Sequence, residues 1–260
     1  MAKIRDWNLF ETNLGRAEQI PYEVAVLPIG ATEAHNLHLP YGTDSFQVQA
    51  IAERACKLAW EEKAQVMLLP TILIGINENT LGFPWTLSFK PTTILQMLRD
   101  ITSCLEHHRL LKLLILNGHG GNELKPFLRE LHRETKVQIT LADWWTVDRH
   151  AMQATFDEPG EHGGEMETSL MLHLHPELVE MDRADEGRTR EPHLTGMKEG
   201  WAWIARPWDK LTTNSGVGNP EAATADKGEK FIDACVRKIA DLIVEMDQET
   251  LDEWYPYETD

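Results

Sequence analysis

Short apolar runs alternate with amphipathic segments along most of this 260-residue chain. The runs have the length and branched aliphatic content of buried strands, and the segments between them have the apolar spacing of helices. Parallel strands need a crossover connection, so strands that alternate with helices form a parallel sheet covered on both faces. We therefore predict an α/β fold, a single three-layer α/β/α domain over residues 1–260 with a mostly parallel central sheet.

Four strands and five main helices are predicted. The strands are expected at 23–30, 65–72, 110–118 and 137–145, and the helices at 43–62, 90–108, 122–135, 165–175 and 229–254. Thr43 or Asp44 is expected to cap the first helix, and Asn122 the third. Residues 183–220 are rich in charge, tryptophan and glycine, and are expected to form a long loop.

Charge and composition limit the classes of partner. The formal net charge is −17, which disfavours nucleic acid and anionic membrane surfaces and is compatible with bound cations, although an acidic surface alone also explains it. No apolar run reaches the roughly 18 residues of a membrane span, and the first residues lack the apolar stretch of a signal peptide. Cys56, Cys104 and Cys235 lie far apart, which favours a reducing compartment. We expect a cytoplasmic protein.

Residues that can bind metals follow the first and third predicted strands. The loop "GATEAHNLHLPYGTD" contains Glu33, His35 and Asp44, and "NGHGGN" places His119 between glycines. Loops at the carboxyl ends of parallel strands open on one edge of the sheet, where ligands bind. Carboxylate and imidazole are common ligands of Zn, Mn and Fe. The four residues are therefore candidate metal ligands, although each alone could be a helix cap, a solvated acid or an exposed turn histidine.

The stretch "HGGEMETSLML" adds two acids and a histidine. Glu167 shares the apolar stripe of the predicted helix, whereas Glu165 shares its face with more polar residues. An inward-facing carboxylate needs a partner, which a metal, an arginine or a helix end could be. His162 precedes two glycines and is expected to be exposed enough to move a proton near neutral pH.

Together these stretches resemble the motifs of the creatininase family, the creatinine amidohydrolases and their relatives. The first resembles G-[ST]-T-E-x-H-x-x-H-L-P-x-x-T-D, "NGHGGN" matches the second family motif, and "HGGEMETSLML" resembles H-A-G-x-x-E-T-S-x-M-L. "GFPWTLSFKP" and "SGVGNPEAATADKGEK" are similar to two further segments, so the resemblance covers most of residues 22–230. It implies the family's three-layer fold, a small-molecule amide substrate, and a homo-oligomer, a hexamer.

The resemblance also implies roles for individual residues. Two divalent metal ions, Zn first with Mn or Fe as alternatives, are implied, and the residues that match their ligands are Glu33, His35, Asp44, His119 and Glu167. Asp44 matches the bridging carboxylate. His162 matches the catalytic histidine, which would pass a proton to the leaving nitrogen.

Three positions depart from the creatinine-specific pattern. Gly121 stands where those enzymes carry a glutamate ligand, Glu158 where they carry a tryptophan, and Trp85 where the family often has glycine. These departures weaken creatinine itself as the substrate. We expect Trp85 and Glu158 at the substrate pocket, together with Trp144 and Trp145, which could instead pack in the core.

The expected function is metal-dependent hydrolysis of a non-peptide C–N bond in a cyclic or N-substituted amide, through a water activated by two metals. The family also includes deformylases and a peptide-processing enzyme, so these activities are alternatives. A non-catalytic metal-binding or ligand-binding protein on the same fold is the rival from a different class. The presence of the complete ligand set and of His162 counts against this rival.

Overall fold

The computed structural model describes residues 4–258. Its centre is a four-stranded parallel sheet in the order β2-β1-β3-β4. The strands are β1 (Val24–Ile29), β2 (Val66–Leu68), β3 (Lys112–Asn117) and β4 (Gln138–Asp143). The register of β1 with β3 runs from Val24 opposite Lys112 to Ile29 opposite Asn117. The predicted α/β fold with a parallel sheet is confirmed.

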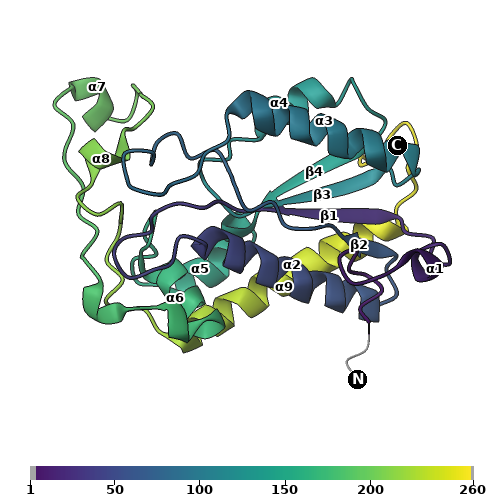
Figure 1. Cartoon of the computed structure of the whole chain (residues 1–260), viewed down its shortest axis with the longest axis horizontal. Coiled ribbons are helices and arrows are strands. Elements are labelled where there is room, and N and C mark those ends of the chain that lie inside the picture. Colours follow the sequence, from purple (N-terminus) through teal and green to yellow (C-terminus); the bar gives the residue numbers. More distant parts are fainter. Residues whose placement is uncertain (1–3, 259–260) are drawn as a thin grey trace.

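Helices cover both faces of the sheet (Figure 1). One face carries α3 (Pro91–His107) and α4 (Lys125–Leu131), and the other carries α2 (Thr43–Glu61) and α9 (Ala225–Gln248). Successive strand side chains point to opposite faces, so β3 contributes to both cores. Leu113 and Ile115 pack on the α3 side, and Leu114 and Leu116 pack on the α9 side.

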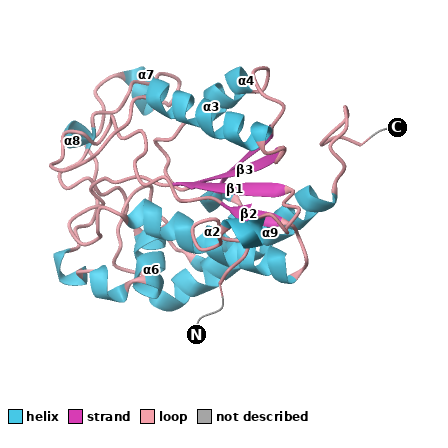
Figure 2. Ribbon diagram, turned by 45° about the vertical axis from the view of Figure 1, so that its right-hand side comes forward, coloured by secondary structure: helices cyan, strands magenta, loops and turns pink. Residues whose placement is uncertain are grey.

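Shorter helices complete the chain. They are α1 (Leu14–Ala17), α5 (Arg149–Thr155), α6 (Glu165–Leu174), α7 (Thr195–Lys198) and α8 (Trp208–Leu211). Figures 1 and 2 show that α7, α8 and several long loops gather at one end of the sheet, away from α1. Within the described residues, no helix combines the length and apolar content needed to cross a bilayer.

The first residues of two predicted helices differ from expectation. Gly42 is the N-cap of α2, so neither Thr43 nor Asp44 caps that helix, and Asp44 lies in its first turn. The last helix begins earlier than predicted, because the Thr224 side chain accepts a hydrogen bond from the backbone N–H of Lys227 and caps α9.

Asn122 does not cap α4, which begins only at Lys125. Its side-chain oxygen accepts a hydrogen bond from the backbone N–H of Ile76 (2.8 Å), and its amide nitrogen donates to the carbonyl of Gly30 (3.2 Å). Asn122 therefore joins the loops that follow β1 and β2 to the loop that follows β3. The turn between β3 and α4 is therefore stabilised by hydrogen bonds to distant loops. Local helix propensity does not account for such bonds.

Candidate metal centre

The carboxyl ends of β1 and β3 bring four predicted site residues together. Glu33 and His35 lie in the loop after β1, His119 lies two residues beyond the end of β3, and Asp44 lies in the first turn of α2. The four residues are at most 8% exposed. Parallel topology requires these loops to open on one edge of the sheet, and they do.

Asp44 lies between the two histidines. Its Oδ1 is 3.0 Å from His35 Nε2, and its Oδ2 is 3.1 Å from His119 Nδ1. The same His119 nitrogen is 3.1 Å from Glu33 Oε1. Two carboxylates and two imidazoles therefore surround one small volume.

Two carboxylate oxygens of this cluster have no hydrogen-bond partner among the described residues: Glu33 Oε1 and Asp44 Oδ2. The other oxygen of Glu33 accepts a hydrogen bond from Thr80 Oγ1 at 2.5 Å. Buried carboxylate oxygens that accept no hydrogen bond are costly, and the nearest charged atom to both is the shared His119 Nδ1, 3.1 Å from each. This donor set fits a bound cation.

Within residues 4–258, three groups have metal-binding atoms that lie within 4.8 Å of one another, and these are Glu33–Asp44–His119, His35–Asp44–Glu167 and Glu33–His35–His162. Asp44 belongs to the first two groups, so cations held by each of them would share its carboxylate. This arrangement fits a two-metal site with a bridging aspartate. The third group makes His162 a candidate ligand as well as a candidate proton carrier.

Neighbouring charges move the pKa values of the cluster in opposite directions. Burial raises the pKa of Glu33, but the charges of His119 and His162 and the hydrogen bond from His119 together lower that pKa to about 2. Burial lowers the pKa of His35, but the charge and hydrogen bond of Asp44 raise it to about 10. Burial, with the negative charge of Asp44, raises the pKa of Glu167 to about 7. The buried carboxylates of the cluster are stabilised by nearby positive charge, which protonated histidines or divalent cations can supply.

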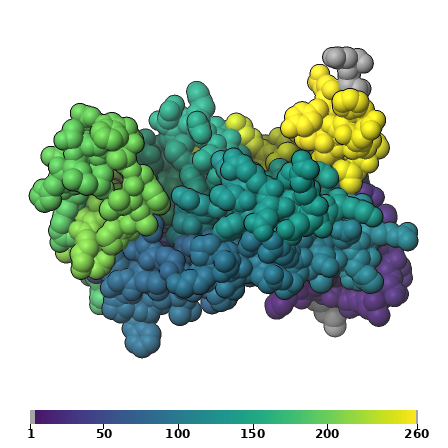
Figure 3. All heavy atoms as spheres, turned by 90° about the horizontal axis from the view of Figure 1, so that it is seen from above, coloured from purple at the N-terminus to yellow at the C-terminus, as the bar shows by residue number. Residues whose placement is uncertain are grey.

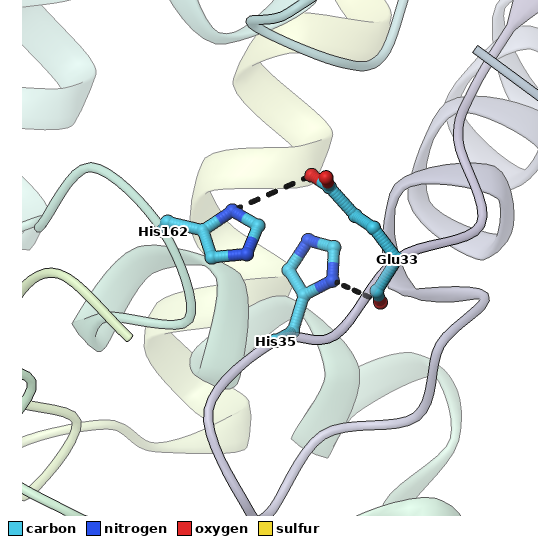
Figure 4. Close-up of side chains that lie close together, drawn as sticks. All are labelled: Glu33, His35 and His162. Atoms are coloured by element: carbon cyan, nitrogen blue, oxygen red, sulfur yellow. Dashed lines mark hydrogen bonds and ion pairs between the residues drawn. The ribbon is translucent and has the colours of Figure 1, made fainter. Parts of the chain in front are cut away.

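His162 is buried, so the expectation that it is exposed is wrong. Its ring stacks on that of His35 with centroids 4.0 Å apart, and its Nδ1 is 3.7 Å from Glu33 Oε1 (Figure 4). Its Nε2 is 2.7 Å from the carbonyl oxygen of Ala34. The backbone of His162 also pairs with Val217, so a distant segment covers the glycine-rich turn that the sequence left open.

The two acids of α6 have different partners. The carboxylate of Glu167 lines the cavity described below and accepts a hydrogen bond from the backbone N–H of Gly163 at 2.5 Å. Glu165 is fully buried and forms an ion pair with Lys227, and its other oxygen accepts from the backbone N–H of Glu158 at 2.9 Å. The prediction that Glu167 is the inward-facing acid is wrong, because Glu165 is the more buried of the two and Glu167 is only partly buried. Of the two acids, Glu167 is the one that lies near the histidine cluster.

A cavity of about 320 Å³ opens above this cluster. It is lined by Glu33, Asp44, Ile76, Asn77, Glu78, Asn79, Thr80, Pro91, His119, Gly120, Gly121, Glu123, Glu161, His162, Glu167, Trp203, Arg206 and Trp208. The sequence analysis placed no residue of 76–80 in the site, nor Pro91, Glu123, Glu161, Trp203, Arg206 or Trp208. The high tryptophan and charge content of 183–220 was a signal for the last three, but it was interpreted only as a loop.

None of the four residues expected to bind substrate lines this cavity. Trp144 is 1% exposed and packs against Phe231, and Trp145 packs on the edge of the same core. The pocket-wall prediction for these two is wrong, because the short helix after β4 packs Trp144 on Phe231 of α9 and Trp145 edge-on against Trp144. Trp85 is 85% exposed, and Glu158 is also at the surface.

Comparisons with known proteins agree with this geometry. The family model described as creatinine amidohydrolase matches residues 11–243. The creatinine amidohydrolase of Pseudomonas putida is 29% identical over 85% of this chain and 89% of its own length. The mycofactocin precursor peptide peptidase of Mycobacterium ulcerans is 27% identical over 89% of this chain and 91% of its own.

Solved structures extend the match. A Bacteroides fragilis protein named after creatinine amidohydrolase superposes with a TM-score of 0.88 at 39% identity, over 95% of this chain and 99% of its own. Creatininase in a manganese form (TM-score 0.75) and a variant in a Zn–Zn form (TM-score 0.77) are each 25% identical and match 94% of this chain and all of theirs. The match of the family model to nearly the whole chain shows that this protein belongs to the creatininase family.

Proposed function

We propose that the protein is a metal-dependent hydrolase that cleaves a C–N amide bond of a small molecule at the carboxyl edge of the sheet. The observation that carries the proposal is a pair of buried oxygens, Glu33 Oε1 and Asp44 Oδ2, that accept no hydrogen bond and share His119 Nδ1 as their neighbour in the lining of a cavity. Known creatininases with manganese or with two zinc ions support two divalent ions here.

Five side chains would hold the ions. Glu33 and His119 would bind one ion, His35 and Glu167 would bind the other, and Asp44 would bridge the two. Divalent ions at such a site lower the pKa of a bound water and polarise the amide carbonyl. Gly121 supplies no carboxylate, and Glu167 lies within reach of His35 and Asp44.

His162 is the group placed to move the proton. Its Nε2 faces the Ala34 carbonyl oxygen, so this nitrogen carries the proton and Nδ1 is left free to accept one on the Glu33 side. As the water oxygen bonds to the carbonyl carbon, His162 would take the water's proton and pass it to the nitrogen of the breaking C–N bond.

The substrate is a small amide other than creatinine. The cavity volume suits a small molecule, and the creatinine-specific glutamate and tryptophan are replaced by Gly121 and Glu158. The peptidase relative makes a short peptide the second candidate. Trp203, which is 73% exposed while lining the cavity, favours this second candidate, since it leaves the mouth open to a longer chain.

The test begins with elemental analysis of the purified protein and continues with a panel of cyclic amides, N-formyl amines and short peptides, each with and without chelator. We expect bound Zn or Mn, and hydrolysis that the chelator abolishes and added metal restores. His119→Ala should abolish both. Bound metal without hydrolysis of any compound would favour the non-catalytic alternative, and a protein that binds no divalent metal would exclude the proposal.

A further inference from the structure

The segment 183–220, whose sequence predicted only a loop, lies over His162. Figure 3 shows the green part of the chain that contains it as a lobe at one end of the molecule. The ring of Trp208 meets the ring of His162 edge-on, with centroids 4.8 Å apart and an angle of 68°. Trp208 is 6% exposed, and its backbone N–H donates to the carbonyl of Asn79 at 3.0 Å. The bond to Asn79 therefore ties Trp208 to the loop after β2 while its indole contacts His162.

Arg206 reaches the residue beside His162. Its guanidinium donates two hydrogen bonds to the carboxylate of Glu161, one of them 3.0 Å long. The same guanidinium lies over the Trp208 ring at 5.3 Å. Trp208 thus contacts the His162 ring, and Arg206 binds the residue that precedes His162. Both Arg206 and Trp208 line the cavity.

An exposed ion pair by itself contributes little to stability. Arg206 and Glu161 are 38% and 49% exposed, so stability alone gives a weak reason for the pair. A bidentate fork does supply orientation, because the planar guanidinium fixes the carboxylate in two directions. Orientation matters here because Glu161 is the residue that precedes His162 in the chain, so fixing its carboxylate also restrains the backbone of His162.

We propose that Arg206 and Trp208 are positioning residues that set the imidazole of His162 for proton transfer. The proposal rests on the proposed function, because it gives His162 the proton-transfer role. Through these two residues, the short segment 206–208 links the wall of the cavity to the position of the His162 ring.

The kinetic test compares Arg206→Ala with Arg188→Ala, in metal-loaded full-length protein. Arg188 lies in the same segment and forms an exposed ion pair with Glu186, outside the cavity lining, so its loss should change nothing. A misplaced catalytic group can cost about 100-fold, so we expect Arg206→Ala to lower kcat by about 10- to 100-fold with KM nearly unchanged. Metal content and Tm should stay at the parent values.

A double-mutant cycle tests whether Arg206 affects kcat through His162. If Arg206 acts through His162, Arg206→Ala should lower kcat no further in a His162→Ala background. Exchange of the pair, Glu161→Arg with Arg206→Glu, should recover part of the lost kcat. Trp208→Phe should keep more activity than Trp208→Ala. An equal loss in the His162→Ala background, or a loss confined to KM, would show that Arg206 does not position His162.

A measurement without turnover keeps this inference separate from the proposed function. In zinc-loaded protein with ¹⁵N-labelled histidine, the His162 ring signals are identified by their disappearance in His162→Ala. Arg206→Ala should shift or broaden those signals, whereas Arg188→Ala should not. Unchanged His162 signals in Arg206→Ala would overturn the inference even if the amide panel succeeds. Changed signals would support it even if no compound on the panel is cleaved.

Discussion

Gly121 lies directly against the imidazole of His119. A Cβ atom built on Gly121 would overlap His119 Nε2 and come within 2.6 Å of the carbonyl oxygen of Ile76. The imidazole nitrogen in question lies 3.2 Å from the same carbonyl, which turns Nδ1 toward Glu33 and Asp44. The position where the creatinine-specific motif has a glutamate is therefore the position at which the His119 ring needs a residue without a side chain.

Substitution of Gly121 should therefore weaken metal binding. Gly121→Ala forces either His119 or the backbone at Ile76 to move, so we expect metal affinity to fall by about 10- to 100-fold, as for the loss of a group that orients a ligand. Gly120→Ala is the matched control, since a Cβ there meets nothing within 4 Å. Zinc titration of both variants checks this. Equal affinities would show that the ring of His119 tolerates the added methyl group.

His119 itself should be needed for both metal and activity. His119→Ala removes the nitrogen that faces Glu33 Oε1 and Asp44 Oδ2, and should lower metal affinity by more than the roughly 100-fold cost of losing an outer partner. His107→Ala, at the exposed end of α3, should leave metal content and rate intact. Full metal occupancy of the His119 variant in elemental analysis would contradict its role as a ligand.

The acids of α6 should separate metal binding from stability. Glu167→Gln should reduce metal content, because its carboxylate faces His35 and Asp44. Glu165→Gln should keep the metal but lower the free energy of unfolding by about 1–3 kcal/mol, since it weakens a charged hydrogen bond to Lys227 at a buried site. Elemental analysis and urea denaturation of both variants check the pair. Loss of metal in both variants, or only in Glu165→Gln, would reverse the assignment.

His162 should be separable from the ligands. If it carries the proton, His162→Ala should retain both metals and lose about 10²–10⁴-fold in rate, which is the usual contribution of a general acid or base. Metal content and kcat on the best compound of the amide panel are the measurements. His162 also belongs to one group of possible metal ligands. If His162→Ala loses a metal ion, His162 is a ligand and the prediction is contradicted.

Creatinine should be hydrolysed poorly or not at all. Aromatic contacts contribute about 0.5–1.5 kcal/mol beyond burial, and the indoles of Trp144 and Trp145 pack toward the core instead of the cavity. Glu158, at the tryptophan position, is exposed and lies outside the cavity lining. A creatinine turnover assay with metal-loaded protein checks this, and a rate like that of dedicated creatininases would contradict it.

The parallel sheet and the meeting of Glu33, His35, Asp44 and His119 at its edge were predictable from the sequence. Strand and helix periods are local properties, and the order of parallel strands places their following loops on one edge. The family motifs then assigned chemistry to those loops. Gly121 was recognised as a departure, but its contact with His119 was not foreseen.

Which residues form the walls of the site could not be predicted, because it depends on contacts between distant parts of the chain. An indole suits a core and a pocket equally well, so its sequence position could not show that Trp208 lines the cavity while Trp144 packs on Phe231. Likewise, the glycines around His162 suggest exposure, but the rings of His35 and Trp208 and the return of the chain at Val217 bury it. Local patterns determine which elements form and where they end, whereas burial and partner choice depend on residues far away in sequence, which only the folded chain brings together.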